Sequence, residues 1–124
     1  TPTRRSPATS RPILRTADSV HRYSVQCRFD REDVADAWVA WLRAEHIRDV
    51  LDAGAVRAGL VRLDDPHPSY RIDYDFPDRA ACEHYLAVHA DRLRADGLER
   101  FPIELGLDYG RSNGDVIAVF PTTQ

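Results

Sequence analysis

His46 is the residue of this sequence whose type and position best suit proton transfer. It lies near the end of an apolar helical stripe that also carries Trp38 and Leu42. Because the ordinary pKa of histidine is close to neutral, an imidazole there can act as a general acid or base. It can equally serve to end the helix, by bonding terminal carbonyls and interacting favourably with the helix dipole. The residues leave both roles open, and His46 is the candidate catalytic residue.

A second group of candidates consists of large side chains on predicted inward faces. An aromatic wall with a few polar tips suits a pocket for a small organic molecule, although such residues also fill ordinary cores. A histidine on an apolar helix face is, in the same way, either a ligand contact or a hydrogen-bonded core residue. The candidate ligand-binding residues are Trp38, Trp41, Tyr74, Tyr85 and His89.

Several other chemistries lack the residues that they need. All 17 basic residues are arginine, which excludes a lysine Schiff base and the lysine of a P-loop. No serine lies in a nucleophile-elbow motif. Two cysteines, Cys27 and Cys82, are too few for a zinc site, and His84 and His89 point to different faces of their helix. We therefore predict neither a metal nor a cofactor.

The net charge of −3 is unevenly distributed. Residues 1–19 contain four arginines and one aspartate, so the remainder is acidic, which gives no reason to expect a nucleic-acid partner. No stretch has the roughly 18 apolar residues of a membrane span or the pattern of a secretory signal. We expect a cytoplasmic protein without a membrane partner.

The candidate residues lie on a predicted succession of elements, β-α-β-β-α-β, over residues 20–120. We predict that these elements form one domain. Apolar and polar residues alternate in three of the four strands, as expected where one face is buried. The predicted strands cover residues 21–29, 55–63, 69–76 and 103–109.

Apolar residues at helical spacing predict a helix from Asp30 to Gly54 and a second from Asp78 to Gly97. The Asn-Gly pair within residues 111–115 predicts a turn, after which residues 116–120 return as an extra C-terminal strand. Residues 1–19 contain three prolines and no hydrophobic period, so we expect a flexible arm rich in Arg, Pro, Ser and Thr.

Two βαβ units with right-handed crossovers predict an α+β fold, the ferredoxin-like split βαβ sandwich with antiparallel sheet order 4-1-3-2. In this order Arg22 and Arg28 of the first strand lie beside acidic residues of its neighbours, which favours the pairing. The acidic residues expected there are Asp73, Asp75, Glu104 and Asp108.

Two stretches of sequence resemble a small bacterial family of uncharacterised proteins that share a domain of unknown function. The resemblance covers about residues 20–109. The matching positions are Trp41, Leu42, His46, Ile47, Val50 and Leu51 in the first helix, and Tyr85, Leu86, His89, Ala90, Leu93 and Arg94 in the second.

The resemblance implies a place among the dimeric α+β barrels, which include cofactor-free monooxygenases, haem-handling enzymes, decarboxylases and isomerases. It further implies a pocket between the sheet and the helices, and a histidine in the element that corresponds to the helix of His46 in several of these enzymes. It implies no particular activity. A homodimer is predicted, either through the helix-free face of the sheet, which is unusually charged for an interface, or through residues 116–120 as an edge strand.

Two hypotheses about function follow. In the first, the protein binds a small apolar or aromatic molecule between sheet and helices, either as a binding protein or as a cofactor-free enzyme that uses His46. In the second, it is a non-catalytic dimerisation or protein-interaction domain. The sequence decides neither whether the protein is an enzyme nor which molecule it binds.

Overall fold

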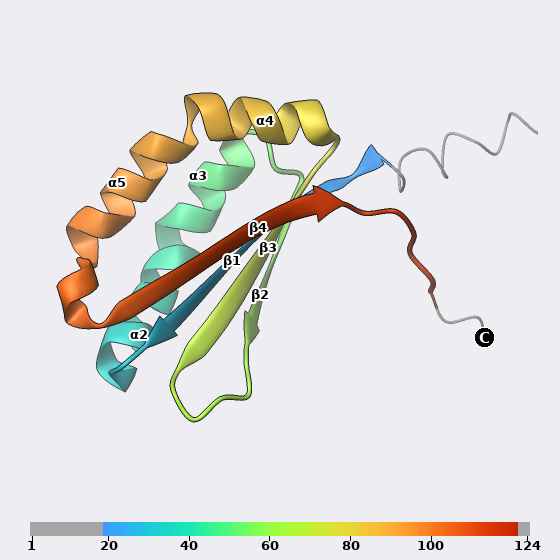
Figure 1. The fold of residues 1–124 in the computed structure, drawn as a ribbon. Helices are drawn as coiled ribbons and strands as arrows, with labels where there is room; N and C mark the ends of the chain where they lie inside the picture. Colours follow the sequence, from blue (N-terminus) through green and yellow to red (C-terminus); the bar gives the residue numbers. More distant parts are fainter. Residues whose placement is uncertain (1–18, 122–124) are drawn as a thin grey trace, which may run out of the picture.

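The computed structural model describes residues 19–121, so the predicted arm lies outside the described residues except for Ser19. Figure 1 shows the helices gathered on one side of a single twisted sheet. In chain order the elements are β1 (His21–Phe29), α2 (Glu32–Trp41), the π-helical turn η2 (Leu42–His46), α3 (Ile47–Asp52), β2 (Arg57–Arg62), β3 (Ser69–Phe76), α4 (Arg79–Val88), α5 (Ala90–Arg100), the 3-10 turn η3 (Ile103–Leu105) and β4 (Leu107–Asp115). None of the helices within residues 19–121 is long and apolar enough to cross a membrane.

The strands form one antiparallel sheet in the order β2-β3-β1-β4. This is the predicted order 4-1-3-2 read from the other edge, so the ferredoxin-like α+β fold is confirmed. β1 lies at the centre, where Tyr23 pairs with Tyr74 of β3 and Cys27 pairs with Tyr109 of β4. The two halves of the chain therefore meet along β1.

The helix-covered face of the sheet carries the core. Alternate residues of β1 are buried, from Tyr23 at 4% exposed to Phe29 at 0%, as the period-two pattern predicts. Trp38 of α2 packs edge-on against Phe29, with ring centroids 5.0 Å apart. Burying two aromatic side chains of this size stabilises the packing of α2 on β1 more than a single hydrogen bond would.

The helix-free face carries charge that is paired within the chain. Asp75 accepts hydrogen bonds from Arg22 Nε at 2.7 Å and from Arg57 Nη2 at 3.1 Å. The bond from Arg22 is the main reason that the pKa of Asp75 is lowered. Ser24 donates to Asp73 at 2.7 Å on the same face. The predicted cross-strand pairing of Arg22 with Asp75 is thus confirmed.

β4 differs from the prediction at both ends. Residues 103–105 form a 3-10 turn, and the strand begins only after Gly106, whose φ of 92° is a left-handed conformation that breaks an extended chain. A Cβ at Gly106 would lie 2.7 Å from the Asp30 carboxylate, so this position requires glycine. Glu104 accordingly lies outside the sheet, and its expected pairing with the arginines of β1 is wrong.

The predicted turn at the Asn-Gly pair is also wrong. Asn113 and Gly114 lie within β4 and pair with Tyr23 and Arg22 of β1. Because β1 is nine residues long, it supplies backbone partners that an isolated turn signal does not anticipate. No extra C-terminal strand exists within the described residues: the Val116 N–H still donates to the Val20 carbonyl at 2.9 Å, and the chain after it runs away from the end of the sheet (Figure 1).

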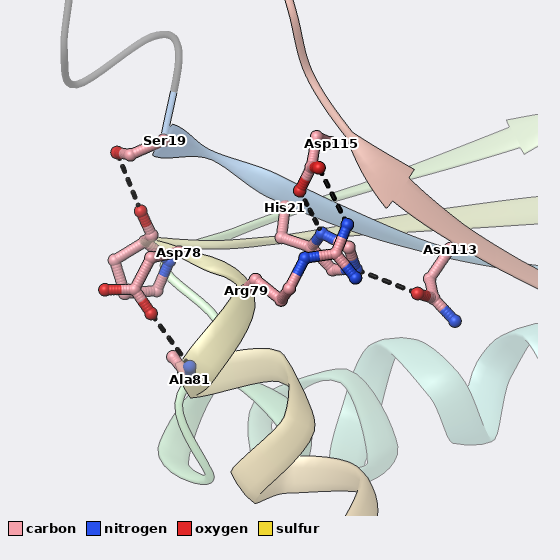
Figure 2. A network of polar contacts seen from close by, with 8 residues as sticks. Ser19, His21, Asp78, Arg79, Ala81, Asn113 and Asp115 are labelled. Atoms are coloured by element: carbon pink, nitrogen blue, oxygen red, sulfur yellow. Dashed lines mark hydrogen bonds and ion pairs between the residues drawn. The ribbon is translucent and has the colours of Figure 1, made fainter.

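The end of β4 is fixed by a cluster of side chains that we call the His21 network (Figure 2). The His21 ring is 1% exposed, with Nδ1 2.8 Å from Asp115 Oδ1 and Nε2 2.8 Å from Asn113 Oδ1. Arg79, at the start of α4, donates to the other oxygen of Asp115 at 2.7 Å. The hydrogen bond from His21, and next the one from Arg79, lower the pKa of Asp115. The network therefore ties β1, β4 and α4 together.

The helices also depart from the prediction in two places. The second helix begins as predicted, because Asp78 caps it by accepting from the Ala81 N–H at 2.8 Å. It then bends at His89, which divides it into α4 and α5. Gly97 does not end this helix but lies buried within α5, where a Cβ would approach Trp41 to 3.2 Å. Even a methyl group at this position would therefore require the Trp41 indole to move slightly.

Candidate functional site

A cavity of about 50 Å³ lies between the sheet and the helices α2 and α5. Its walls are mainly aromatic, and we call it the aromatic cavity. Leu98 and Arg111 are exposed and form the rim at which it meets solvent. The lining residues are Tyr23, Val25, Trp38, Trp41, Leu42, His46, Ile72, Tyr74, Tyr85, Leu93, Arg94, Gly97, Leu98, Tyr109 and Arg111.

A π-helical turn positions His46 in this wall. Residues Leu42–His46 follow α2 without a break, and the N–H of Ile47 bonds to the carbonyl of Leu42, five residues earlier. A single wide turn of this kind rotates the residues beyond it relative to a regular helix, and such turns are frequent at functional sites. The amino-acid types of this turn give no sign of it, so sequence reasoning missed it.

The His46 ring stacks on the Trp41 indole, with centroids 4.6 Å apart and planes 25° from parallel. Its Nδ1 atom is buried and has no hydrogen-bond partner. Burial lowers the pKa of His46 below the ordinary 6.5, and the opposing attraction of Asp49 and Asp96 is smaller. The neutral imidazole therefore predominates at neutral pH, and its Nδ1 can accept or donate a proton.

Three further buried polar atoms of the cavity lining lack a hydrogen-bond partner: Trp41 Nε1, Tyr74 Oη and Arg94 Nε. A buried polar atom without a partner typically costs about 1–3 kcal/mol, so several of them around one space are unusual for a plain core. Burial also raises the pKa of Tyr74, and the phenol is neutral at all ordinary pH values.

Two hydrogen bonds join other polar groups of the lining and hold the wall in place. Trp38 Nε1 donates to the Tyr109 hydroxyl at 3.0 Å, and Arg94 Nη2 donates to the Tyr23 hydroxyl at 2.9 Å. Desolvation raises the pKa of Tyr109, and likewise that of Tyr85, to about 12, so these hydroxyls stay protonated. The cavity wall thus contains hydrogen-bonded side chains that hold its shape, and buried polar atoms that have no hydrogen-bond partner.

The structure brings together five of the six candidate residues, because His46, Trp38, Trp41, Tyr74 and Tyr85 all line the aromatic cavity. His89 lies elsewhere, at the bend between α4 and α5, with its Nδ1 3.2 Å from Arg92 Nη2.

Sequence reasoning missed Arg94 and Arg111 as parts of the lining. Arg94 is one position along from the predicted apolar stripe and was noted only as a position of the family resemblance, and Arg111 was placed in a turn, so no periodic pattern put either in a cavity wall. Within residues 19–121 no group of three or more His, Cys, Asp or Glu side chains could hold a metal ion.

Residues 20–105 match the family model described as "Domain of unknown function (DUF4286)". The chain belongs to this DUF4286 family. The matched range includes all the elements from β1 to η3 and therefore most of the cavity wall, but it ends before β4. No curated protein matches the chain.

Solved structures share the fold of this DUF4286 protein at low sequence identity. A dimeric ferredoxin-like protein from an uncultured marine organism aligns with a TM-score of 0.62 and 10% identity, over 87% of this chain and 96% of its own. SnoaB, a cofactor-independent oxygenase from Streptomyces nogalater, aligns with a TM-score of 0.62 and 14% identity, over 84% and 99%. The hydroxynitrile lyase from Passiflora edulis aligns with a TM-score of 0.56 and 10% identity, over 84% and 99%. These similarities establish the ferredoxin-like fold alone.

Proposed function

We propose that this DUF4286 protein binds a small, largely apolar or aromatic molecule in the aromatic cavity, with His46 placed to exchange a proton with it. The observation that carries the proposal is the set of unpaired polar atoms in a wall otherwise made mainly of aromatic and aliphatic side chains, above all His46 Nδ1 and Trp41 Nε1. A ligand that supplied partners for them would recover the free energy lost by burying them alone.

The dimensions of the cavity favour a small ligand. About 50 Å³ is well below the roughly 300–1,000 Å³ of sites for drug-sized molecules. A single aromatic ring would therefore enter by displacing the exposed rim residue Leu98 or would extend outward past Arg111. Ring stacking against Trp41 and Tyr74 would supply most of the affinity.

The pKa of His46 supports the role of proton acceptor. A neutral imidazole with a free Nδ1 can take a proton from a weakly acidic group of the ligand, which an imidazolium cannot. The structural neighbours described as a cofactor-independent oxygenase and a hydroxynitrile lyase make a cofactor-free reaction a reasonable extension of this binding role.

Titration of ¹⁵N-labelled protein with toluene and with phenol tests the proposal. The chain has two tryptophans, and the Trp38 indole N–H is bonded to Tyr109 while that of Trp41 is unpaired, so the two indole signals report different environments. We expect both compounds to shift the Trp41 signal much more than the Trp38 signal. Phenol should bind more tightly than toluene, because its hydroxyl can bond to His46, and His46→Phe should remove that difference.

A matched pair of variants locates the binding. Leu98→Phe adds bulk at the cavity rim, whereas Val88→Phe adds the same group at an exposed position of α4 outside the lining. Binding should weaken in Leu98→Phe and stay unchanged in Val88→Phe. If neither toluene nor phenol shifts the Trp41 signal at millimolar concentration, the proposal is wrong.

The alternative, a non-catalytic dimerisation domain, is supported by a different part of the chain. Ile117, Val119 and Phe120 are 83%, 64% and 90% exposed, which is a large apolar surface for a free segment. This segment follows β4, an edge strand of the sheet, and could pair with the edge of a second copy. Two similar structures are described as dimeric ferredoxin-like proteins, so we propose a homodimer formed by this C-terminal segment.

Light scattering after size exclusion tests the homodimer. The full chain should have twice the monomer mass of 14.1 kDa, and deletion of residues 117–124 should give the monomer while leaving the His21 network intact. A dimer that survives the deletion would instead point to the helix-free face. His46→Ala, which lies far from this segment in sequence, is the control and should leave the mass unchanged.

A further inference from the structure

The aromatic cavity is lined by two arginines and no carboxylate. Arg94 comes from α5 and Arg111 from β4, so a guanidinium lies on the helical side and another on the sheet side. Neither forms an ion pair with an acidic residue of the described range 19–121. The chain as a whole has a net charge of −3, whereas the cavity lining contains two positive side chains and no negative one.

The two guanidiniums are held by neutral partners. Arg94 uses Nη2 to donate to the Tyr23 hydroxyl at 2.9 Å and leaves its buried Nε without an acceptor. The Arg111 guanidinium lies over the Tyr109 ring, 4.8 Å from the ring centroid. Tyrosine contacts orient an arginine without neutralising it, and Asp91, whose charge also acts on Arg94, is not in contact with it as an ion pair, so both charges remain available to a ligand.

The unpaired atoms specify which hydrogen-bonding partner is missing. Arg94 Nε and Trp41 Nε1 can only donate. The Tyr74 hydroxyl, also unpaired, can donate as well. The fourth unpaired atom, His46 Nδ1, donates in one tautomer of the neutral ring, so all four atoms can be satisfied by acceptors on the ligand. A charged oxygen is favoured beside arginine because charge-assisted hydrogen bonds are the stronger ones.

We infer that the ligand class of this cavity is a small aromatic carboxylate, whose ring packs against Trp41 and Tyr74 while Arg94 and Arg111 bind the carboxylate. The inference rests on the proposed function and adds to it the charge and the polar group of the ligand. A planar carboxylate matches the planar fork of a guanidinium, which can donate to both oxygens at once.

Three probes of similar size and different charge test the inference: benzoate, benzamide and benzylamine. Dissociation constants are measured from the Trp41 indole signal of ¹⁵N-labelled full-length protein at pH 7 and low salt. We expect benzoate to bind at least about tenfold more tightly than benzamide, with benzylamine weakest. The preference should shrink as salt is raised, because the rim arginine is exposed to solvent.

Arginine variants assign the preference to residues. Arg111→Gln removes an exposed charge and should fold normally, and Arg94→Gln keeps a donor at the level of Nε but gives up the bond from Nη2 to the Tyr23 hydroxyl. Each should reduce the preference for benzoate over benzamide by about tenfold. Arg48→Gln, an exposed arginine outside the lining, is the control and should change nothing.

The outcomes separate this inference from the proposed function. Equal binding of benzoate and benzamide would overturn the carboxylate inference and leave the binding cavity standing. A preference for benzoate that Arg48→Gln reduces as much as Arg111→Gln would also overturn it, because the effect would then reflect overall charge. If no probe, neutral or charged, shifts the Trp41 signal, both the inference and the proposed function fail.

Discussion

Two histidines of this DUF4286 protein, His21 and His46, differ in the hydrogen-bond partners of their rings. His21 is 1% exposed, and each of its ring nitrogens lies 2.8 Å from an oxygen, on Asp115 and on Asn113 (Figure 2). His46 is half-buried and stacked on Trp41, and its Nδ1 has no partner. One imidazole is saturated by the protein, while the other retains an unused hydrogen-bonding atom.

The difference extends to the surroundings of each residue. The His21 network connects β1, β4 and α4, and its charged members are paired with one another. The aromatic cavity around His46 also contains unpaired atoms of Trp41, Tyr74 and Arg94. A saturated network contributes to stability, whereas unsatisfied buried groups reduce it. We propose that a ligand satisfies those of the aromatic cavity. Stability and binding should therefore respond oppositely to mutation in these two regions.

The largest effect is expected from His21→Ala. It removes two hydrogen bonds and leaves a buried space, so the free energy of unfolding should fall by about 3 kcal/mol, measured by urea denaturation. His46→Ala is the comparison and should lower it by about 1 kcal/mol or less. Equal losses for the two substitutions would contradict the distinction between a structural and a binding histidine.

A tyrosine pair gives an intermediate effect. Tyr109→Phe leaves the buried Trp38 N–H without its acceptor and should cost about 1–2 kcal/mol of unfolding free energy. Tyr74→Phe removes a buried hydroxyl that has no partner, so it should be neutral or stabilising by up to about 1 kcal/mol. Thermal and urea denaturation of both variants measure this, and a destabilised Tyr74→Phe would mean that its hydroxyl has a partner in solution.

The pH dependence of stability should depend on His46 in a defined direction. Its pKa is lower in the folded state than the ordinary 6.5, so the unfolded state binds the proton first as pH falls. The stability associated with the neutral ring is therefore complete above about pH 6.5 and is lost as pH falls toward the folded-state pKa.

His46→Phe keeps an aromatic ring beside Trp41 but cannot be protonated. Its stability should change less than that of the wild type between pH 7 and pH 5, measured by urea denaturation at each pH. His84→Phe replaces an exposed histidine outside the cavity lining and controls for the loss of a titrating group. Identical pH profiles for wild type and His46→Phe would show that the His46 ring is solvated like a free histidine.

The smallest effect is expected from Gly97→Ala. Alanine favours a helix over glycine by about 1 kcal/mol, but the new methyl would meet Trp41 Cη2 at 3.2 Å. Since Trp41 borders the aromatic cavity, it can shift, and the net change in unfolding free energy should stay within about 0.5 kcal/mol. The Trp41 indole signal should move while that of Trp38 does not. A large loss of stability would indicate that the cavity wall cannot yield.

Much of the fold follows from local patterns. The alternation in residues 21–29 and 69–76 assigns the inward and outward faces of the two central strands, and the burial of Tyr23 and Tyr74 agrees with it. The crossover rules then limit the strand order to the one observed. Four aromatic residues of the cavity could be named from period alone: strand alternation puts Tyr74 on the helix-covered face, and helical spacing puts Trp38, Trp41 and Tyr85 on the inward sides of their helices.

The sequence by itself determined the order of the elements and the inward faces, since both depend on residues that are neighbours along the chain. Only the tertiary structure decided the extent of β4, where backbone partners on β1 outweigh a local Asn-Gly turn signal. It also decided the π-helical turn that places His46 in the cavity wall. The tertiary structure likewise decided which polar atoms of the lining, including Arg94 Nε, have no hydrogen-bond partner. Those features depend on groups far apart in sequence, and hydrogen-bond competition between distant segments leaves no periodic mark in the residues themselves.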